Sequence, residues 1–261
     1  MDLGLGKRVA LVAAGSKGLG RAVAEELAAE GAAVVICARG REGVDGTCRA
    51  IAATGARVHG VVADVSEPGA PERVVAEATR VFGAPDIVVT NSGGPRSGLF
   101  ETLTDEDWDG AVRTLLTSAV AFARAALPSM RARRWGRIIN ITSIAAKQPV
   151  DGLMLSNSLR IAVLAFAKTL SNEVAADGIT VNSLLPGYTR TQRVVDLAQE
   201  KSAASGKGVE EFFRQWEAEI PMRRIAEPRE FAALAAFLAS DRAGYITGQS
   251  IAVDGGWIKG L

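Results

Sequence analysis

The stretch KRVALVAAGSKGLGRAVAEELAAE, from Lys7 to Glu30, decides the fold. It joins a valine-containing apolar run at 9–12 to three glycines, Gly15, Gly18 and Gly20, and then to an amphipathic segment at 21–30. That order predicts a strand, a tight turn and a helix. A helix N-terminus presents unpaired N–H groups, and glycines let a pyrophosphate approach the backbone. The stretch therefore predicts a dinucleotide-binding unit rather than an ordinary glycine turn.

The composition indicates one domain over residues 1–261, because no linker-like run of Pro, Ser or charge divides the chain. Lys and Arg number 30 against 29 for Asp and Glu, so a net charge of +1 argues against nucleic acid or a membrane surface as a partner. Cys37 and Cys48 have neither metal spacing nor a disulfide framework, which fits a reducing cytosol. The N-terminal apolar run is too short for a signal or a membrane span. We expect a cytoplasmic protein without a metal site.

Strands and helices alternate along the rest of the chain. Further strands are expected at 33–38, 58–62, 86–90, 137–142, 179–184 and 250–253, and helices at 44–53, 72–82, 108–130, 153–176 and 228–239. This alternation predicts an α/β, Rossmann-type three-layer fold, with a seven-stranded parallel sheet, helices on both faces and ligands at the carboxyl ends of the strands. The segment 191–220 contains bulky residues, among them Phe212, Phe213 and Trp216, and a central stretch at 202–208 that is rich in Ser, Ala and Gly. It predicts a mobile helical lid over a partly apolar small-molecule substrate.

Basic residues near the glycine turn favour NADP(H) over NAD(H). The second strand is followed by Arg39 and not by the carboxylate that would bind a ribose 2′-hydroxyl, and Lys17 lies within the turn. Cations here can accommodate a 2′-phosphate, although solvated surface charges would give the same pattern. Asp64, after the third strand, is expected to accept from the adenine amino group or to begin the next helix.

Several motifs, taken in order, resemble the short-chain dehydrogenase/reductase family, of the type that includes 3-oxoacyl-carrier-protein reductases. They are AAGSKGLG (13–20), Asp64-Val65, Thr90-Asn91-Ser92-Gly93, Asn140-Ile141-Thr142-Ser143, Pro186-Gly187 with Thr191, Ile220-Pro-Met-Arg-Arg, and Ile251-Ala-Val-Asp-Gly-Gly256. The resemblance covers nearly the whole chain and implies a homo-oligomer, either a dimer or a tetramer. The implied cofactor contacts, with Arg39 added, are Gly15, Ser16, Lys17, Gly18, Leu19, Gly20, Arg39, Asp64, Val65, Asn91, Arg160, Pro186, Gly187 and Thr191.

The glycine turn departs from the family pattern. The family's T-G-x-x-x-G-x-G becomes A-A-G-S-K-G-L-G, so Ala14 stands at its first glycine and Gly15 is new. Because the glycine content is unchanged, we expect the turn still to hold a pyrophosphate.

The family's catalytic residues are substituted at three of four positions. Ser143 keeps the serine, whereas Leu115, Ser156 and Arg160 stand where the family has Asn, Tyr and Lys. A serine hydroxyl is far harder to ionise than a phenol, and arginine stays protonated, so the family's proton route is absent. We expect Ser143 and Ser156 to hydrogen-bond a carbonyl oxygen together, and Arg160 to bond the nicotinamide ribose.

Two residues could replace the missing acid. Tyr188 supplies a phenol just after Pro186-Gly187, and Lys147 lies four residues past Ser143. Tyr188 is the better candidate because its phenol is the missing group. Each of these two could instead be a surface or lid-packing residue, and Ser156 could be a helix-start hydroxyl.

These features predict an NADP(H)-dependent oxidoreductase that acts on a carbonyl or hydroxyl group, similar to a 3-oxoacyl-thioester reductase, with an altered proton donor. Two other classes stay open, because fold does not decide among them. One is a dinucleotide-binding sensor or partner subunit without redox turnover. The other is a non-redox isomerase or lyase on the same fold.

Overall fold

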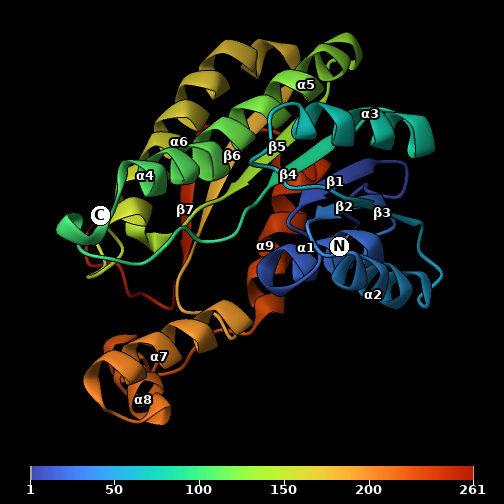
Figure 1. The fold of residues 1–261 in the computed structure, drawn as a ribbon. Coiled ribbons are helices and arrows are strands. Elements are labelled where there is room, and N and C mark those ends of the chain that lie inside the picture. Colours follow the sequence, from blue (N-terminus) through green and yellow to red (C-terminus); the bar gives the residue numbers. More distant parts are fainter. Residues whose placement is uncertain (1, 261) are drawn as a thin grey trace.

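A seven-stranded parallel sheet forms the centre of the computed structural model, which describes residues 2–260 (Figure 1). The strand order is β3-β2-β1-β4-β5-β6-β7, and each neighbouring pair is parallel. The strands are β1 Val9–Ala13, β2 Ala33–Ala38, β3 Val58–Val62, β4 Ile87–Thr90, β5 Gly136–Ile141, β6 Ile179–Pro186 and β7 Ser250–Val253. The order reverses between β1 and β4, where ligands bind in open α/β sheets.

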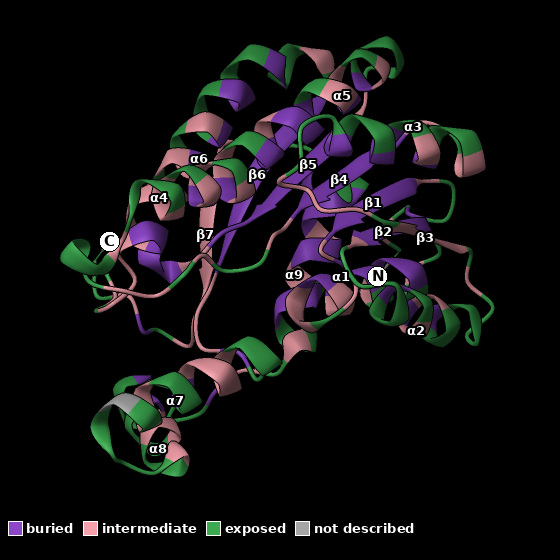
Figure 2. Ribbon diagram, in the orientation of Figure 1, coloured by how far each residue is buried: buried purple, intermediate pink, exposed green. Residues whose placement is uncertain are grey.

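Helices cover both faces of the sheet. One face carries α1 Gly18–Ala29, α2 Arg41–Ala52 and α9 Pro228–Ala239, and the other carries α3 Ala70–Phe82, α5 Ser118–Arg133 and α6 Met154–Val174 (Figure 1). Successive residues of β1 point to opposite faces, so that Ala10 and Val12 join the first cluster and Leu11 and Ala13 the second. The central strands are therefore buried on both sides, as Figure 2 shows, which explains why they read as continuous apolar runs.

The long helix expected at 108–130 is interrupted. It consists of α4 Asp105–Val112, a π-helical turn at Arg113–Thr117 and then α5. Ser118 Oγ donates to the Thr114 carbonyl oxygen at 2.6 Å, and the buried Leu115 lies inside the π-helical turn. By length and composition alone the run Asp105–Arg133 could cross a membrane, but here it packs on the sheet beside α3 and α6.

The segment after β6 forms a two-helix arm at the carboxyl end of the sheet. It contains α7 Gln192–Ser205 and α8 Val209–Glu219, which project from the body in Figure 1. The two ends of the arm meet in a short parallel bridge, where Arg190 N donates to Ala226 O at 2.8 Å and Ala226 N donates to Tyr188 O at 3.1 Å. Apolar side chains join the arm to the loop after β5 and to the C-terminal segment. The buried members of this cluster are Ile144, Ala146, Leu185, Ala198, Trp216, Ile220, Ile225 and Trp257.

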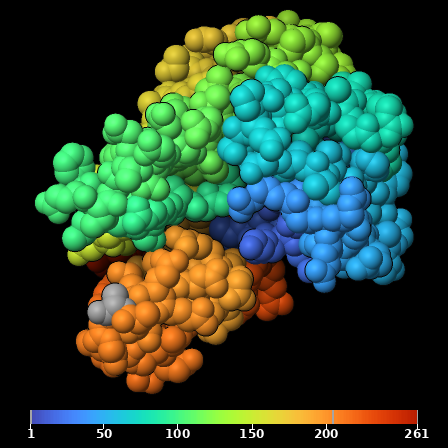
Figure 3. Space-filling model, viewed as in Figure 1, coloured from blue at the N-terminus to red at the C-terminus, as the bar shows by residue number. Residues whose placement is uncertain are grey.

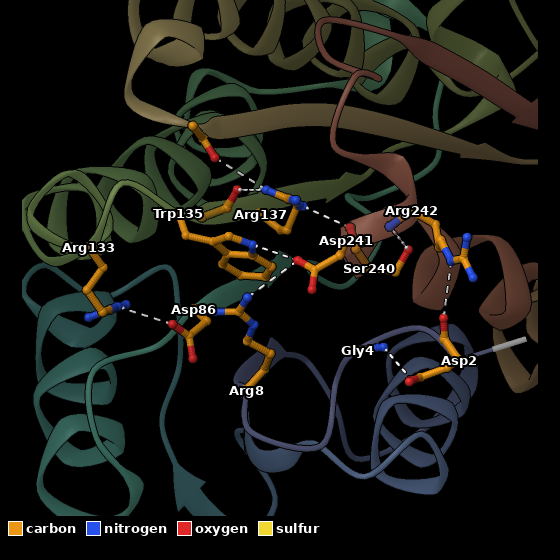
Figure 4. Close-up of polar contacts among 12 residues, drawn as sticks. Asp2, Gly4, Arg8, Asp86, Arg133, Trp135, Arg137, Ser240, Asp241 and Arg242 are labelled. Atoms are coloured by element: carbon orange, nitrogen blue, oxygen red, sulfur yellow. Dashed lines mark hydrogen bonds and ion pairs between the residues drawn. The ribbon is translucent and has the colours of Figure 1, made fainter.

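An aromatic and ionic cluster ties the opposite end of the sheet together (Figure 4). The guanidinium carbons of Arg8 and Arg137 lie 3.6 and 4.2 Å from the centroid of the Trp135 ring, on opposite faces of the indole. Trp135 Nε1 donates to Asp241 Oδ1 at 2.8 Å. This cluster joins the start of β5 to the N-terminal segment and to the end of α9, so the arginines of this region are engaged within the chain.

Candidate active site

In the glycine turn between β1 and α1, neighbouring atoms approach the glycine backbone closely. A Cβ atom on Gly20 would collide with the Ala14 carbonyl oxygen and lie 2.7 Å from Asn91 Nδ2, and one on Gly15 would lie 2.9 Å from Ile36. Ala14 itself has φ of +48°, in the left-handed region that favours glycine. Ala14 therefore adopts a backbone conformation that favours glycine, while Gly15 gives the turn room beside β2.

The N-terminus of α1 can hold an anion. No side chain caps it, its first turn contains no acidic residue, and Lys17 immediately precedes it. The first N–H groups of a helix lack internal partners and favour negative charge. Thr191 lies over this end of the helix, since a Cβ on Gly18 would be 3.6 Å from Thr191 Cγ2. The structure thus brings Gly18, Thr191 and Asn91 together, although the sequence separates them widely.

Arg39 and Asp64 lie at the same edge of the sheet, after β2 and β3. Arg39 is exposed, and Asp64 Oδ1 accepts from Ser66 N at 2.9 Å and from Ser66 Oγ at 2.7 Å. Burial raises the pKa of Asp64, but the Ser66 hydrogen bonds and the charge of Arg39 outweigh it, so the net shift is downward. Asp64 is therefore an ionised acceptor, with Val65 beside it in the chain and a cation nearby.

Ser156 and Arg160 are hydrogen-bonded to each other at the start of α6. Arg160 Nε donates to Ser156 Oγ at 3.2 Å, and Arg160 Nη1 donates to the carbonyl oxygens of Thr142 and Ile141 at 2.8 and 3.3 Å. Burial, with a smaller contribution from the charge of Arg193, lowers the pKa of Arg160 to about 10. Arg160 thus remains cationic at neutral pH. Because Ser156 Oγ accepts from Arg160, its own proton is free to be donated.

Ser143 also keeps a free proton. It caps the short 3-10 turn Ile144–Ala146, where its Oγ accepts from Ala145 N at 3.1 Å. Lys147, at the end of that turn, is exposed. Ser143 follows β5 directly, and Arg160 is bonded to the last carbonyl groups of the same strand. The two serines are therefore presented at the carboxyl end of β5.

A cavity of about 10 Å³ lies beside Arg160. That is room for about one water molecule. Its lining residues are Thr90, Asn91, Ser92, Leu115, Ser118, Ala119, Ile141, Thr142, Arg160 and Val163. Leu115 reaches this cavity from the π-helical turn. An apolar side chain thus lies beside the cavity next to Arg160.

Tyr188 belongs to the aromatic cluster of the arm. Its ring stacks on Trp216, with centroids 4.6 Å apart and planes 13° apart, and meets Trp257 edge-on at 6.2 Å. Burial, reinforced by the charge of Glu219, raises the pKa of Tyr188 to about 12. A general acid works best with a pKa near the working pH. This placement weighs against Tyr188 as the proton donor and favours a packing role.

Arg193 is a site residue that the sequence reasoning missed. It stands in the first turn of α7, and its Nε would lie 3.2 Å from a Cβ on Gly94. Its Nη2 donates to Ser97 Oγ and its Nη1 to Glu200 Oε1, each at 3.3 Å. Figure 3 shows the orange arm and the green part of the chain that includes α4 on either side of a hollow, with the blue N-terminal part at its back. Arg193 therefore links the arm to the loop after β4.

The comparisons with known proteins agree with this geometry. A family model described as Enoyl-(Acyl carrier protein) reductase matches residues 13–258. The chain belongs to the short-chain dehydrogenase/reductase family. Within it, the chain is 37% identical over 250 residues to 3-oxoacyl-[acyl-carrier-protein] reductase of Haemophilus influenzae, covering 95% of this chain and 97% of that protein.

Two solved structures of the short-chain family share the fold. L-sorbose reductase from Gluconobacter frateurii, complexed with NADPH and L-sorbose, has a TM-score of 0.95 and 36% identity over 100% of both chains. A variant of actinorhodin polyketide ketoreductase with NADPH has a TM-score of 0.92 and 33% identity, covering 96% of this chain and 97% of that one. The predicted fold class is therefore confirmed, and the chain is an oxidoreductase by family, with ketoacyl reductases among its homologues.

Proposed function

We propose that the protein is an NADP(H)-dependent reductase that acts on the carbonyl group of a small, partly apolar substrate, without the family's tyrosine as proton donor. The observation that carries this proposal is the hydrogen bond from Arg160 Nε to Ser156 Oγ. It leaves a hydroxyl donor, backed by a positive charge, at the family's tyrosine position. Ser143, directly after β5, supplies a second hydroxyl donor.

The residues present fit a dinucleotide. The uncapped N-terminus of α1, which begins at Gly18, would hold the pyrophosphate. Lys17 and Arg39 would bind a 2′-phosphate. The remaining contacts would come from Gly15, Ser16, Leu19, Asp64, Val65, Asn91, Arg160, Pro186, Gly187 and Thr191. When bound, the cofactor supplies a hydride. That the two solved relatives above contain NADPH supports this choice over NADH.

The protein's own part in the reaction is electrostatic. Ser143 Oγ and Ser156 Oγ donate hydrogen bonds to the carbonyl oxygen, and the charge of Arg160 stabilises the negative charge that develops there. Arg160, whose pKa is about 10, keeps its proton, so the proton that completes the alcohol comes from water. One carbonyl, one hydride and one proton give one alcohol.

The arm at 191–220 is proposed as the substrate lid. Its apolar cluster, with Trp216 at the centre, packs against the loop that carries Ser143, which suits a partly apolar ligand. By family resemblance we also propose a homo-oligomer, dimer or tetramer, in the cytoplasm. The relatives' printed names, which include an L-sorbose reductase, support a small-molecule substrate.

The test compares Ser156→Ala with Ser158→Ala. Ser158 lies two residues further along α6, and the only hydrogen bond of its side chain among the described residues is to Met154 Sδ at 4.0 Å, which makes it a matched control. NADPH binding is followed by nicotinamide fluorescence, and turnover by loss of the reduced cofactor's absorbance with ketones and acetoacetyl thioesters. Removal of a donor to a developing oxyanion lowers kcat about 100-fold. We expect that loss in Ser156→Ala, no such loss in Ser158→Ala, and unchanged NADPH affinity.

Other outcomes point elsewhere. Tight NADPH binding without turnover on any substrate would favour the dinucleotide-binding sensor or a non-redox isomerase or lyase. The observation that favours these alternatives is that Tyr188, one of only two tyrosines in the chain, is packed in the lid cluster. Failure to bind either NADPH or NADH would refute the cofactor assignment.

A further inference from the structure

Arg160 carries a charge that no carboxylate balances within ion-pair distance in the described part of the chain. Its protein partners are the Ser156 hydroxyl and the carbonyl oxygens of Ile141 and Thr142, and its Nη2 has none among residues 2–260. A partly buried charge without a counter-charge is unfavourable. The site therefore has a place for an anion beside Arg160.

Arg193 brings a second guanidinium to the same place from the lid. Its Nε lies against Gly94, whereas Arg160 shares the small cavity with Asn91 and Ser92. Both arginines therefore lie near the short turn 91–94. In agreement with this closeness, the charge of Arg193 adds to burial in lowering the pKa of Arg160.

The positive charge of the two arginines is only partly offset. Glu200 is the one carboxylate that the described residues bring within ion-pair distance of either arginine, at 3.3 Å from Arg193. The side chains of Arg193 and Glu200 are 44% and 50% exposed, and ion pairs at such sites contribute little to stability. Ser97 Oγ, which contacts both, does so at 3.3 Å, so all three contacts are long. Arg193 can therefore exchange this pairing for a ligand at small cost.

We propose that the substrate carries a carboxylate, which binds between Arg160 and Arg193, so that the substrate class is a small, partly apolar oxo acid. The inference rests on the proposed function for the position of the carbonyl group, and it adds the charge. The planar guanidinium matches a carboxylate with two parallel hydrogen bonds. The cofactor's pyrophosphate has an anion site of its own at the uncapped N-terminus of α1.

Binding of inert probes tests the inference without redox turnover. Pentanoate and its uncharged analogue pentanamide are titrated calorimetrically into the protein saturated with NADPH. We compare wild type with Arg193→Gln, with Arg193→Lys and with the control Arg214→Gln. Arg214 is exposed on α8 and has no ion pair among the described residues. Loss of a hydrogen bond to a charged group lowers affinity roughly 10- to 100-fold.

We expect wild type and Arg214→Gln to bind pentanoate at least about tenfold more tightly than pentanamide. Arg193→Gln should lose this preference, and Arg193→Lys should keep part of it, while NADPH affinity changes little. Equal affinity for the two probes in wild type, or a preference that survives Arg193→Gln, would overturn the proposal. A parallel loss of NADPH and pentanoate affinity would assign Arg193 to the cofactor and overturn it as well.

Turnover separates this inference from the proposed function. If the protein reduces carbonyl compounds, kcat/KM for levulinate should exceed that for methyl levulinate, and Arg193→Gln should remove the difference. If wild type prefers pentanoate in binding and yet fails to oxidise NADPH whichever carbonyl compound is added, the reductase assignment fails and the carboxylate site stands.

Discussion

Ala14 gives the most direct test of how the glycine turn is built. Its φ of +48° lies in the left-handed region, which costs a residue with a Cβ about 1–2 kcal/mol. Ala14→Gly should remove that strain. Glycine in turn lowers stability by about 0.4–1 kcal/mol through the greater freedom of the unfolded chain. The half-buried Ala14 methyl is not part of the buried core, so little packing is lost.

The difference between these terms predicts that Ala14→Gly raises the free energy of unfolding by about 0.5–1 kcal/mol. For a chain of this size that corresponds to a rise in Tm of roughly 1–4 °C. Urea denaturation followed by circular dichroism, together with calorimetry, measures both quantities. The control is Ala13→Gly, one residue earlier in β1, where the alanine is fully buried and has no positive φ.

Ala13→Gly should destabilise the protein, because it removes a core methyl group and adds the freedom of glycine without relieving strain. The sign of the effect therefore separates the two neighbours. If Ala14→Gly lowers Tm as Ala13→Gly does, the assignment of strain to Ala14 is wrong, and the turn must be stabilised by contacts of the alanine methyl instead.

Two further predictions concern pH. Hydrogen bonds from Arg224 hold the pKa of Glu230 at about 2, below its usual value of about 4.3. This group therefore stabilises the fold fully above its unfolded pKa, and the contribution is lost as pH falls through the folded pKa; acid titration of Glu230→Gln should show a smaller drop in Tm than wild type over that window. In the active site, Arg160 and Tyr188 have pKa values of about 10 and about 12. We expect kcat/KM for reduction to show no ionisation between about pH 6 and pH 9, and a clear ionisation step there would reveal an acid that this mechanism lacks.

Local signals were enough to predict most of the fold. The predicted ranges 33–38, 58–62, 250–253 and 228–239 coincide with β2, β3, β7 and α9. These segments are apolar runs that begin or end beside glycine, proline or charged residues, so their limits follow from short-range chemistry. The parallel sheet followed from their alternation with helices.

The π-helical turn could not be predicted in the same way. No proline or glycine lies within 113–117, and the apolar helical period runs through 108–130 without a break. The interruption depends on how the helix packs on the sheet and on the Ser118 hydrogen bond to Thr114, neither of which the period contains.

The candidate site likewise contains residues that sequence motifs located and one residue, Arg193, whose position depends on tertiary packing. Leu115, Ser156 and Arg160 were located by motif intervals, and the structure places all three at the carboxyl ends of β4 and β5. Arg193 was not found, because its position depends on the angle at which the lid leaves the sheet. No spacing along the chain predicts that Arg193 lies against Gly94.

The bridge between Thr189 and Ala226 has a consequence for how this protein can vary. It brings the two ends of the α7–α8 arm side by side, so a short connection would be enough to join them. The entropic cost of closing a loop rises slowly with the length of the loop. An arm of different length between the same two ends would therefore disturb the rest of the fold little. The pair of helices is thus an exchangeable module. Replacing it with the corresponding arm of a ketoacyl reductase would change the substrate specificity and leave the cofactor-binding residues unchanged.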